Sequence, residues 1–318
     1  YLFSARGRSF TVPVHQLPEA KWGDSGTAIV NVVALEKEDS IVSVLVMDTL
    51  DTDESACFVT QRGAVKMTPL KEFESQRSAG VVAMKVADDD KIIEVFRTSG
   101  GGHIMMATWE GNSIRFPMEE VPSRGRSAGG VRGIRLNSRD EVVDVVLLPS
   151  DDIGEVGIIT DEGRAKRSPL SEYPVQHRGG RGVRCIRKRM RLPHQVQAVD
   201  WWPSQVTPFE RIRMILSDYS YVEAGVAEMA NAGRDGNGYE WAPLADGQKV
   251  LEAHRLHVPV PMIEGEDGEQ IPSIIVPDPA QEPPKPVVIV KADSRGGWAL
   301  NLPGLDGAEP TEDSTEEE

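Results

Sequence analysis

The sequence has few cysteines, no long apolar run and little helical periodicity. Its two cysteines, Cys57 and Cys185, lie in separate apolar stretches and form no CxxC pair, so neither a disulfide framework nor a cysteine metal site is indicated. No segment approaches the roughly 18 uninterrupted apolar residues of a membrane helix, and the start at Tyr1 lacks the features of a secretory signal. We therefore expect a protein of the reducing cytoplasm with no membrane partner. Because Tyr1 already lies in a strand-like run, we also expect a fragment of a longer polypeptide.

Signatures of catalysis are also missing. The sequence has no GxxxxGK[ST] phosphate loop, no HExxH and no GxSxG. His254 and His257 have a spacing that could seat a metal on a helix, but two ligands alone are weak support for a site. The acidic run from Asp88 to Asp90 falls in a predicted turn, where solvated carboxylates are more common than calcium or magnesium ligands. The chain is therefore predicted to be non-catalytic and to hold no cofactor and no metal.

Charge is abundant but segregated along the chain, whose formal net charge is -15. Residues 258–318 carry fourteen acidic and three basic residues, whereas residues 164–191 carry ten Lys or Arg and a single acid, Glu172. A negative average argues against binding to nucleic acid only when the charge is evenly spread. The basic segment is therefore a candidate for binding a polyanion.

A repeat of about fifty residues is the strongest pattern in the sequence. Four copies of a strand, a tight turn and a second strand align on Gly7, Gly63, Gly111 and Gly163, which are 56, 48 and 52 residues apart. A second glycine follows each of these after 17 to 19 residues, and further strand-like segments follow it. Val, Ile, Phe and Thr favour strands, while glycine supplies the positive φ of hairpin turns.

Each repeat predicts four short strands, which is the content of one propeller blade. A fifth, eroded copy follows, with Ser220 at the position of the turn glycine. We therefore predict an all-β, propeller-like domain over residues 1–257, with about five four-stranded blades of which the first is incomplete. Residues 258–318 are rich in Pro, Glu and Asp and are predicted to be a disordered acidic tail.

Basic residues recur at equivalent positions of these repeats. In the segment 176–182, QHRGGRG, glycines would let the backbone approach phosphates, and arginines would supply charge-assisted hydrogen bonds. A single surface arginine usually has no specific role, but recurrence at equivalent positions favours a shared binding surface. The predicted DNA-binding residues are Lys66, Arg77, Arg115, Arg124, Arg126, Arg132, Arg135, Arg164, Lys166, Arg167, Gln176, Arg178, Gly179, Gly180, Arg181, Gly182 and Arg184.

These motifs resemble those of a known family, the C-terminal DNA-wrapping domain of bacterial DNA gyrase A. The segment QHRGGRG is similar to that family's box, Q-[RK]-R-G-G-[RK]-G, and departs from it only at His177. The segments GRSFTVPVHQLPEA, TPLKEFESQRSAG and SAGGVRGIRL resemble parts of the family in the same order. The resemblance covers residues 1–200 well and residues 201–257 poorly.

The resemblance implies a β-pinwheel, a six-bladed propeller variant that wraps duplex DNA around its rim and supports supercoiling by a type IIA topoisomerase. The parent enzyme would be an ATP-dependent isomerase whose catalytic residues lie outside this fragment. The implied partners are double-stranded DNA, the N-terminal part of gyrase A and the gyrase B protein, and the implied location is the cytoplasm, in association with the nucleoid.

Three alternatives stay open. The family's box belongs to its first blade, whereas residues 176–182 lie in a later one, so the related C-terminal domain of the A protein of topoisomerase IV is one alternative. A protein-interaction propeller that never meets DNA is another, and the placement of the basic residues argues against it. A hydrolase on a propeller would need acids and histidines converging in a central channel, and the sequence offers no such set.

Overall fold

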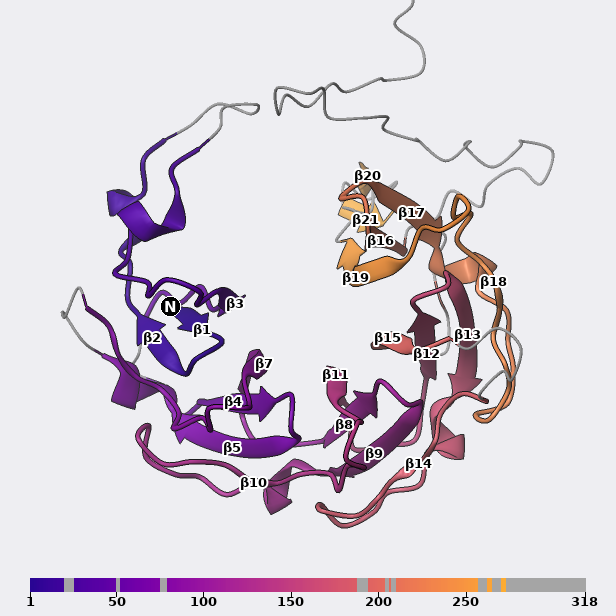
Figure 1. Cartoon of the computed structure of the whole chain (residues 1–318), viewed down its shortest axis with the longest axis horizontal. Coiled ribbons are helices and arrows are strands. Elements are labelled where there is room, and N and C mark those ends of the chain that lie inside the picture. The colour runs from indigo at the N-terminus through magenta and orange to yellow at the C-terminus, as the bar shows by residue number, and fades with distance from the viewer. Residues whose placement is uncertain are drawn as a thin grey trace, which may run out of the picture. The chain divides into compact units, whose positions relative to one another are not determined.

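The structure is a computed structural model that describes residues 1–19, 26–49, 52–74, 79–187, 194–203, 206 and 210–256, and the backbone of 262–264 and 270–272 (Figure 1). The chain divides into two compact units. The first comprises Tyr1–Val206 and Met229–Trp241, and the second comprises Thr207–Glu228 and Ala242–Glu318.

The first unit consists of four antiparallel sheets of four strands each. The first sheet has the order β3 (Ile41–Val44), β1 (Leu2–Ser4), β2 (Arg8–Phe10), β6 (Val81–Val82). The second has the order β7 (Ile92–Thr98), β4 (Ser55–Thr60), β5 (Ala64–Pro69), β10 (Val131–Arg132). The third has the order β11 (Val142–Leu148), β8 (His103–Thr108), β9 (Asn112–Pro117), β14 (Val183–Arg184). The fourth has the order β15 (Val196–Trp202), β12 (Glu155–Thr160), β13 (Arg164–Pro169), β18 (Tyr239–Glu240).

The outermost strand of each sheet comes from the following repeat. After the hairpin of the third sheet, for example, the chain returns to the second sheet, where β10 pairs with β5 through Val131 and Val65. The same exchange joins β6 to β2, β14 to β9 and β18 to β13. Within the first unit the sheets follow one another along an arc, with β7, β11 and β15 on its inner side and β10, β14 and β18 on its outer side (Figure 1). The exchanged strands therefore form the outer edge of this unit.

The turn glycines have the conformation that the repeat predicts. Gly63 lies between β4 and β5 with a φ of 77°, and its N–H donates to the carbonyl of Thr60 at 2.8 Å. A Cβ at this position would lie 2.6 Å from Cγ2 of Ile134, so both the left-handed backbone and the close packing require glycine. Gly7, Gly111 and Gly163 have positive φ in the same turn, which explains their spacing.

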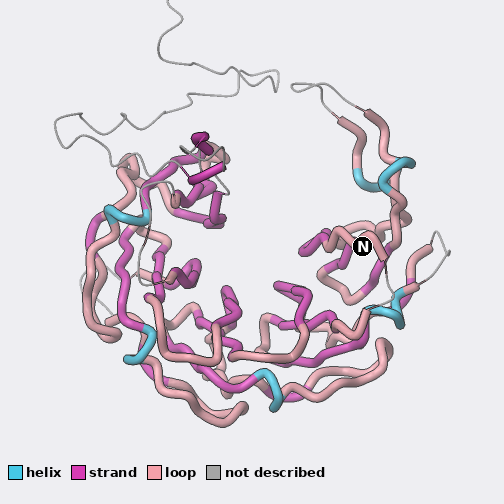
Figure 2. Tube along the Cα trace, turned by 180° about the vertical axis from the view of Figure 1, so that it is seen from behind, coloured by secondary structure: helices cyan, strands magenta, loops and turns pink. Residues whose placement is uncertain are grey.

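Short 3-10 helices follow the hairpins (Figure 2). Prolines end β5, β9 and β13, and a 3-10 helix begins at the next residue. A proline lacks the N–H that would continue the ladder, so it is suited to the end of a strand. The 3-10 helices of the first unit are η1 (Val14–Gln16), η2 (Ile29–Asn31), η3 (Leu70–Phe73), η4 (Met118–Glu120) and η5 (Leu170–Glu172). Among the described residues, no helix has the length and apolar character needed to cross a membrane.

The apolar core lies between successive sheets. Cys57 and Val59 of the second sheet pack in one cluster with Ile104 and Phe116 of the third. The first and second sheets meet at three phenylalanines, and the ring of Phe3 lies edge-on to Phe58 and Phe73 with centroids 5.4 Å apart. Packing of neighbouring sheets face to face is the arrangement of propeller blades. Cys57 and Cys185 are both buried free thiols.

The second unit contains one sheet of three strands, β17 (Tyr221–Gly225), β16 (Arg211–Leu216) and β19 (Val250–Leu256). It also contains the 3-10 helix η6 (Val226–Glu228), and the short strands β20 (Met262–Glu264) and β21 (Gln270–Pro272), which pair with each other. Tyr219 provides the positive φ, 62°, in the turn between β16 and β17. Its N–H donates to the carbonyl of Leu216 at 2.8 Å, as the N–H of Gly163 does to that of Thr160, so the equivalent of the turn glycine is Tyr219 and the prediction of Ser220 is wrong by one residue.

The predicted all-β, propeller-like fold of four-stranded sheets is confirmed. The prediction that the first blade is incomplete is wrong, because β3 supplies its inner strand and β6, from the next repeat, its outer strand. In the described part of the chain, the fifth sheet, formed by β17, β16 and β19, has three strands instead of the predicted four. The division into a domain of residues 1–257 and an acidic tail of residues 258–318 stays a prediction, since most of the tail lies outside the described residues.

Candidate nucleic-acid interface

Three loops of the first unit have equivalent positions beside the outer strands. We call residues 124–130 the first rim loop, residues 176–182 the second and residues 232–238 the third. Each starts beside the second hairpin strand of a sheet and leads into the outer strand of that sheet. The parallel bridges at which they start pair Met67 with Ser123, Arg115 with Val175 and Arg167 with Asn231. The segment with the QHRGGRG motif is therefore the middle one of three related loops.

A glutamate at the third position of a 3-10 helix anchors each rim loop. In every case one carboxylate oxygen accepts the backbone N–H of the third residue of the loop. The pairs are Glu72 Oε2 with Arg126 N at 3.2 Å, Glu120 Oε2 with Arg178 N at 2.9 Å, and Glu172 Oε2 with Arg234 N at 2.6 Å. The backbone N–H of Arg178, together with the nearby His177, holds the pKa of Glu120 below its usual range. These carboxylates are therefore acceptors for loop N–H groups.

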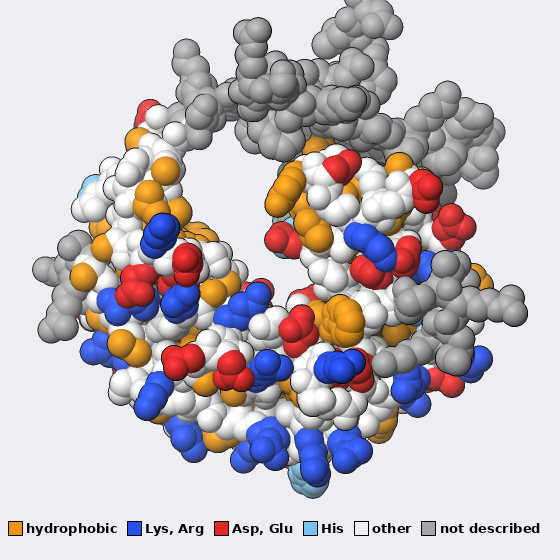
Figure 3. Space-filling view, viewed as in Figure 1, with side chains coloured by type: hydrophobic (Ala, Val, Ile, Leu, Met, Phe, Trp, Pro, Cys, Tyr) orange, Lys and Arg blue, Asp and Glu red, His pale blue; other side chains and the backbone are white. Residues whose placement is uncertain are grey.

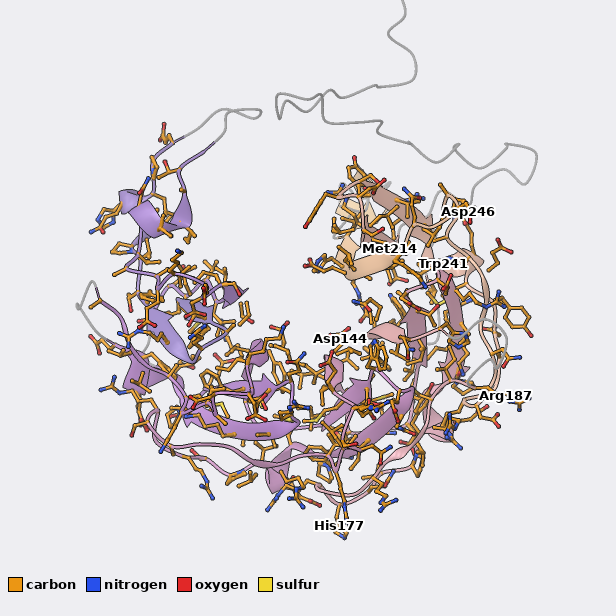
Figure 4. All side chains as sticks on the ribbon, in the orientation of Figure 1. Asp144, His177, Arg187, Met214, Trp241 and Asp246 are labelled. Atoms are coloured by element: carbon orange, nitrogen blue, oxygen red, sulfur yellow. The ribbon has the colours of Figure 1, made fainter. Side chains whose placement is uncertain are left out.

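The second rim loop is also fastened by its own arginine. Arg178 Nε donates to the carbonyl of Glu120 at 2.9 Å, and its Nη1 donates to the carbonyl of Arg132 at 3.2 Å. The third loop repeats the second contact, since Arg234 Nη1 donates to the carbonyl of Arg184. His177 is 97% exposed, with its Nδ1 2.7 Å from Glu120 Oε1, and it lies at the outer edge of the first unit (Figure 4).

Arginines on the exchanged strands add to the same edge. Arg132 ends β10 and Arg184 ends β14, and both side chains are exposed. Three residues further on, Arg135 and Arg187 occupy a second pair of equivalent exposed positions. Lys and Arg side chains gather along the outer edge of the first unit (Figure 3).

A hollow on this edge brings three of the arginines together. It has a volume of about 190 Å³, and Arg135, Arg181 and Arg184 line it beside Gly182. Asp140 and Glu110 also line the hollow, but both carboxylates already accept hydrogen bonds. That of Asp140 accepts the hydroxyl of Thr108 at 2.8 Å and the backbone N–H of Glu110 at 2.9 Å, and that of Glu110 accepts the side-chain amide of Asn137 at 3.1 Å. The guanidinium groups are therefore the groups of the hollow that favour an anion such as phosphate.

Different structural constraints favour glycine at two positions of the second rim loop. Gly182 has a φ of 73°, and a Cβ would lie 2.2 Å from the carbonyl oxygen of Ser113, on the strand that β14 joins. Gly179 has a φ of 80°, but a Cβ there would meet nothing closer than 3.6 Å. Close approach to β9 therefore requires Gly182, whereas the backbone conformation alone favours glycine at position 179.

Three predicted contact residues lie inside the protein, so the prediction that they touch DNA is wrong. Lys66, Arg115 and Lys166 are at most 2% exposed. Arg115 Nη1 forms an ion pair with Asp152 at 2.7 Å and donates to the carbonyl of Tyr173 at 3.4 Å, while its Nη2 lies 3.3 Å from both the carbonyl of Asp151 and Nδ1 of His103. Side chains alternate between the two faces of a strand, and these three point toward a neighbouring sheet.

Two further arginines of β13 are half-buried and engaged within the protein. Arg164 Nη2 donates to the carbonyl of Gly238 at 2.7 Å. Arg167 Nη1 pairs with Glu155 at 2.7 Å, and its Nε donates to the carbonyl of Met229 at 3.2 Å. They support the third rim loop and the segment before it, rather than standing free at the surface.

The remaining predicted residues lie at or beside the outer edge. Arg77 falls outside the described residues. The exposed side chains are Arg124, Arg132, Arg135, Arg178, Arg181 and Arg184, and the partly exposed residues are Arg126, Gln176, Gly179, Gly180 and Gly182. The structure adds residues to this set that the prediction omitted. Arg187 follows Gly182 by the same number of residues as Arg135 follows Gly130, so the repeat could have identified it. The anchoring glutamates could have been identified because they recur two residues after the start of each 3-10 helix.

No metal centre accompanies this surface in the described part of the chain, where no group of three or more His, Cys, Asp or Glu side chains is placed to hold an ion. The surface instead has the features of a phosphate-binding edge: exposed guanidinium groups at repeated positions, backed by loops that carboxylates and carbonyls hold in place.

Comparison with known proteins agrees with the repeat. A family model described as the DNA gyrase C-terminal domain, beta-propeller, matches residues 1–47, 54–99, 102–149 and 156–196, more than half of the chain. The DNA gyrase A protein of Escherichia coli (strain K12) is 34% identical over 289 residues, 88% of this chain. The DNA gyrase A protein of Staphylococcus aureus (strain NCTC 8325 / PS 47) is 28% identical over 312 residues, 98% of this chain. These alignments cover 32% and 34% of the two proteins, so the chain spans about a third of the length of the curated relatives it matches.

Solved structures show the same fold. The C-terminal domain of DNA topoisomerase IV matches with a TM-score of 0.73 and 25% sequence identity, covering 80% of this chain and 78% of that chain. A DNA gyrase A C-terminal domain matches with a TM-score of 0.65 and 17% identity, covering 80% of each chain, and at that identity it supports the fold alone. The family model covers all four turn glycines and the whole second rim loop. This chain therefore belongs to the family of DNA gyrase C-terminal domains.

Proposed function

We propose that the chain binds duplex DNA along the outer edge of its first unit and bends the DNA around it. The observation that carries this proposal is the recurrence of exposed arginines at equivalent places, Arg132 and Arg184 on exchanged strands and Arg135 and Arg187 just after them. A regular series of cations along a curved edge matches the regular phosphates of a duplex. Phosphate contacts position a protein on DNA without reading bases, so we expect little sequence preference.

The electrostatics of such binding are measurable. Each phosphate that an arginine neutralises releases counterions, so affinity falls with salt at a slope of about -0.9 per contact. Bending a site of 20 to 30 base pairs by 40 to 90 degrees costs on the order of 1 to 6 kcal/mol, which several charge-assisted contacts can offset. Wrapping is therefore favourable only if many arginines act together.

The first test reverses the charge of the second rim loop and the adjoining strand. Replacing Arg178, Arg181 and Arg184 by Glu should weaken binding by about 10- to 100-fold at low salt and reduce the salt slope by roughly 3. Fluorescence anisotropy with several unrelated duplexes of about 30 base pairs measures both quantities. The loss should be the same for every duplex.

A matched control reverses three arginines that belong neither to a rim loop nor to an exchanged strand. Arg6 and Arg62 lie at hairpin turns and Arg97 on the inner strand β7, and each is partly exposed beside a carboxylate. Changing these three to Glu alters the net charge equally, so it should leave most of the affinity and the salt slope in place. Equal losses in the two triple variants would mean that only net charge matters, and the assigned edge would be wrong.

In the longer protein, we propose that this chain serves DNA supercoiling as part of a gyrase A protein. The partners would be the N-terminal part of the same protein and the gyrase B protein, and the location would be the cytoplasm near the nucleoid. The identity to curated gyrase A proteins supports this assignment, while the topoisomerase IV likeness supports the alternative. A topology assay of the reconstituted holoenzyme with ATP separates them. Negative supercoiling of relaxed plasmid supports gyrase, whereas activity limited to the relaxation of supercoiled plasmid supports topoisomerase IV.

A further inference from the structure

One buried lysine lies beneath the first rim loop. Lys66 of β5 is fully buried, and its Nζ donates to three carbonyl oxygens, those of Ala83 at 2.8 Å, Gly125 at 3.1 Å and Arg126 at 2.9 Å. An ammonium group has three hydrogens and no acceptor, so this arrangement uses every donor it has. Two of the three carbonyls belong to the loop itself. Lys66 thus holds the loop from inside while Glu72 holds it from outside.

The third rim loop has the same support. Lys166 of β13 is fully buried, and its Nζ donates to the carbonyls of Gly233 at 2.6 Å and Arg234 at 2.5 Å and faces Ser168 Oγ at 3.3 Å. Lys66 and Lys166 each stand three residues after the turn glycine of their repeat. Two repeats therefore have a buried lysine at the same position, and in both the lysine supports a rim loop.

The second rim loop lacks this support. The residue three positions after Gly111 is Ile114, a buried apolar side chain that cannot donate. Besides its backbone hydrogen bonds, that loop has the side-chain contacts of Glu120 and the two carbonyl contacts of Arg178. The lysine position is therefore not required to build a sheet of this kind, which separates its role from that of the core residues around it.

We propose that Lys66 and Lys166 are positioning residues of the DNA interface, each holding a rim loop in the shape in which the basic residues of that edge meet phosphate. This inference rests on the proposed function. Neither ammonium group touches DNA in this arrangement, because both lie beneath the loop backbone.

Burial disfavours the charged form of both lysines in the folded chain. Burial lowers the pKa of Lys66 to about 8, and that of Lys166 to about 8 as well. The charged and titratable groups that face them are Glu72 and Arg124 at Lys66, and Cys185, Glu172, Asp235 and Arg234 at Lys166. An unfolded lysine keeps its proton to a pH of about 10.4, so between about pH 8 and pH 10 the unfolded chain binds more protons and stability rises with pH.

DNA binding should show the opposite dependence on pH. Phosphates brought to the loops favour the charged form of a lysine beneath them, so DNA raises the pKa of Lys66 and Lys166 and binding takes up protons. Affinity therefore falls as pH rises through about 8, by roughly three- to tenfold between pH 7 and pH 9. The arginines of the edge keep their charge over this range, and burial raises the pKa of Cys185 to about 12 and that of Cys57 higher still.

The experiment measures affinity for a duplex of about 30 base pairs, and thermal unfolding, from pH 7 to pH 9 at constant ionic strength. The double variant Lys66→Met, Lys166→Met should stay folded, bind about three- to tenfold more weakly at pH 7, and lose most of the pH dependence. The parent chain should bind more weakly at pH 9 than at pH 7, and its unfolding temperature should rise with pH relative to that of the Met double variant. The variant Lys66→Arg, Lys166→Arg, which keeps its charge throughout, should recover affinity and be insensitive to pH.

Lys91→Met is the matched control, since Lys91 is an exposed lysine away from the rim loops, and it should leave the pH profile unchanged. Two results together would overturn the inference and leave the proposed function standing. The parent chain would bind DNA with the same affinity at pH 7 and pH 9, and the folded Met double variant would bind as tightly as the parent chain. A parent chain that binds no DNA at pH 7 overturns the proposed function itself.

Discussion

At the scale of single residues, the face of a strand decides what a basic side chain does. Lys66 and Lys166 lie on the second strands of their hairpins and point into the protein, where carbonyl oxygens accept their hydrogens. Arg132 and Arg184 lie on the exposed side of the exchanged strands. Successive residues of a strand face opposite sides, so neighbouring basic residues of one hairpin can have unrelated roles.

Glu120 offers a residue-scale test of the loop anchors. Its carboxylate accepts the backbone N–H of Arg178 at 2.9 Å. We expect Glu120→Gln to weaken DNA binding by about two- to tenfold, because a neutral amide oxygen replaces a charged acceptor and weakens the hydrogen bond by roughly 1 kcal/mol, even though the change removes a negative charge from a DNA-binding edge.

Glu119 is the control for this prediction, because it is an exposed neighbour with the same charge on the same 3-10 helix. Glu119→Gln should leave DNA affinity unchanged or raise it slightly, since it removes only a repulsive charge. Anisotropy titrations of the two variants side by side check the difference. If Glu120→Gln binds as tightly as Glu119→Gln, the carboxylate anchor has no influence on the interface.

At the scale of elements, the exchanged outer strands are the shortest strands of the first unit. β14 has two residues and pairs with β9 only through Val183 with Ser113 and Arg184 with Asn112. Such a short strand depends on its flanking turn for its position. The second rim loop ends where β14 begins, so damage to this pairing displaces the loop as well.

Gly182 tests this dependence. Gly182→Ala would place a Cβ 2.2 Å from the carbonyl oxygen of Ser113 and force alanine into a φ of 73°. We expect a loss of about 1 to 3 kcal/mol in the free energy of unfolding. Gly101→Ala is the control, because a Cβ there meets nothing within 4 Å, and it should change stability by less than about 0.5 kcal/mol. Urea unfolding measures both, and equal stabilities would show that β14 tolerates a side chain at its entry.

At the same scale, local sequence patterns specify the hairpins but not the exchanged strands. The hairpins and their turn glycines follow from local patterns, because alternating apolar residues and a glycine of positive φ are properties of a few adjacent positions. The exchange of β6, β10, β14 and β18 into the preceding sheets does not follow from such patterns. A two-residue strand has no periodicity of its own, and its partner residues lie 66 to 76 positions earlier in the sequence.

At the scale of the whole molecule, the feature relevant to function is the arc of sheets in the first unit (Figure 1). The edge that carries the arginines is the outer one, so a straight duplex can meet only part of it at a time. Contact with successive sheets requires the DNA to bend. The cost of that bend therefore enters the affinity as an unfavourable contribution.

Because bending costs free energy, we expect the chain to prefer DNA that is already bent. A duplex of 20 to 30 base pairs that is already curved avoids part of the bending cost of about 1 to 6 kcal/mol, so it should bind more tightly than a stiff duplex of the same length, by about tenfold for every 1.4 kcal/mol avoided. Both duplexes should show the same salt slope if they make the same phosphate contacts. Competition binding of the two duplexes measures the preference. A chain that binds both equally would contact DNA at one sheet only.

The sequence by itself determined the repeat, the all-β class and the family. Each depends on patterns that survive without knowledge of packing: the spacing of Gly7, Gly63, Gly111 and Gly163, the strand-forming residues between them, and the motif at 176–182. The sequence also predicted the arginines of the outer edge, because basic residues recur at equivalent positions of the repeats.

Only the tertiary structure decided which basic residues can reach DNA and which support the others. Lys66, Arg115 and Lys166 have the same charge in the sequence as Arg132 and Arg184, yet neighbouring sheets cover the first three. Burial, partner carbonyls and carboxylate anchors depend on segments brought together from different repeats. A contact between distant segments is a property of packing, and the local sequence around either member does not specify it.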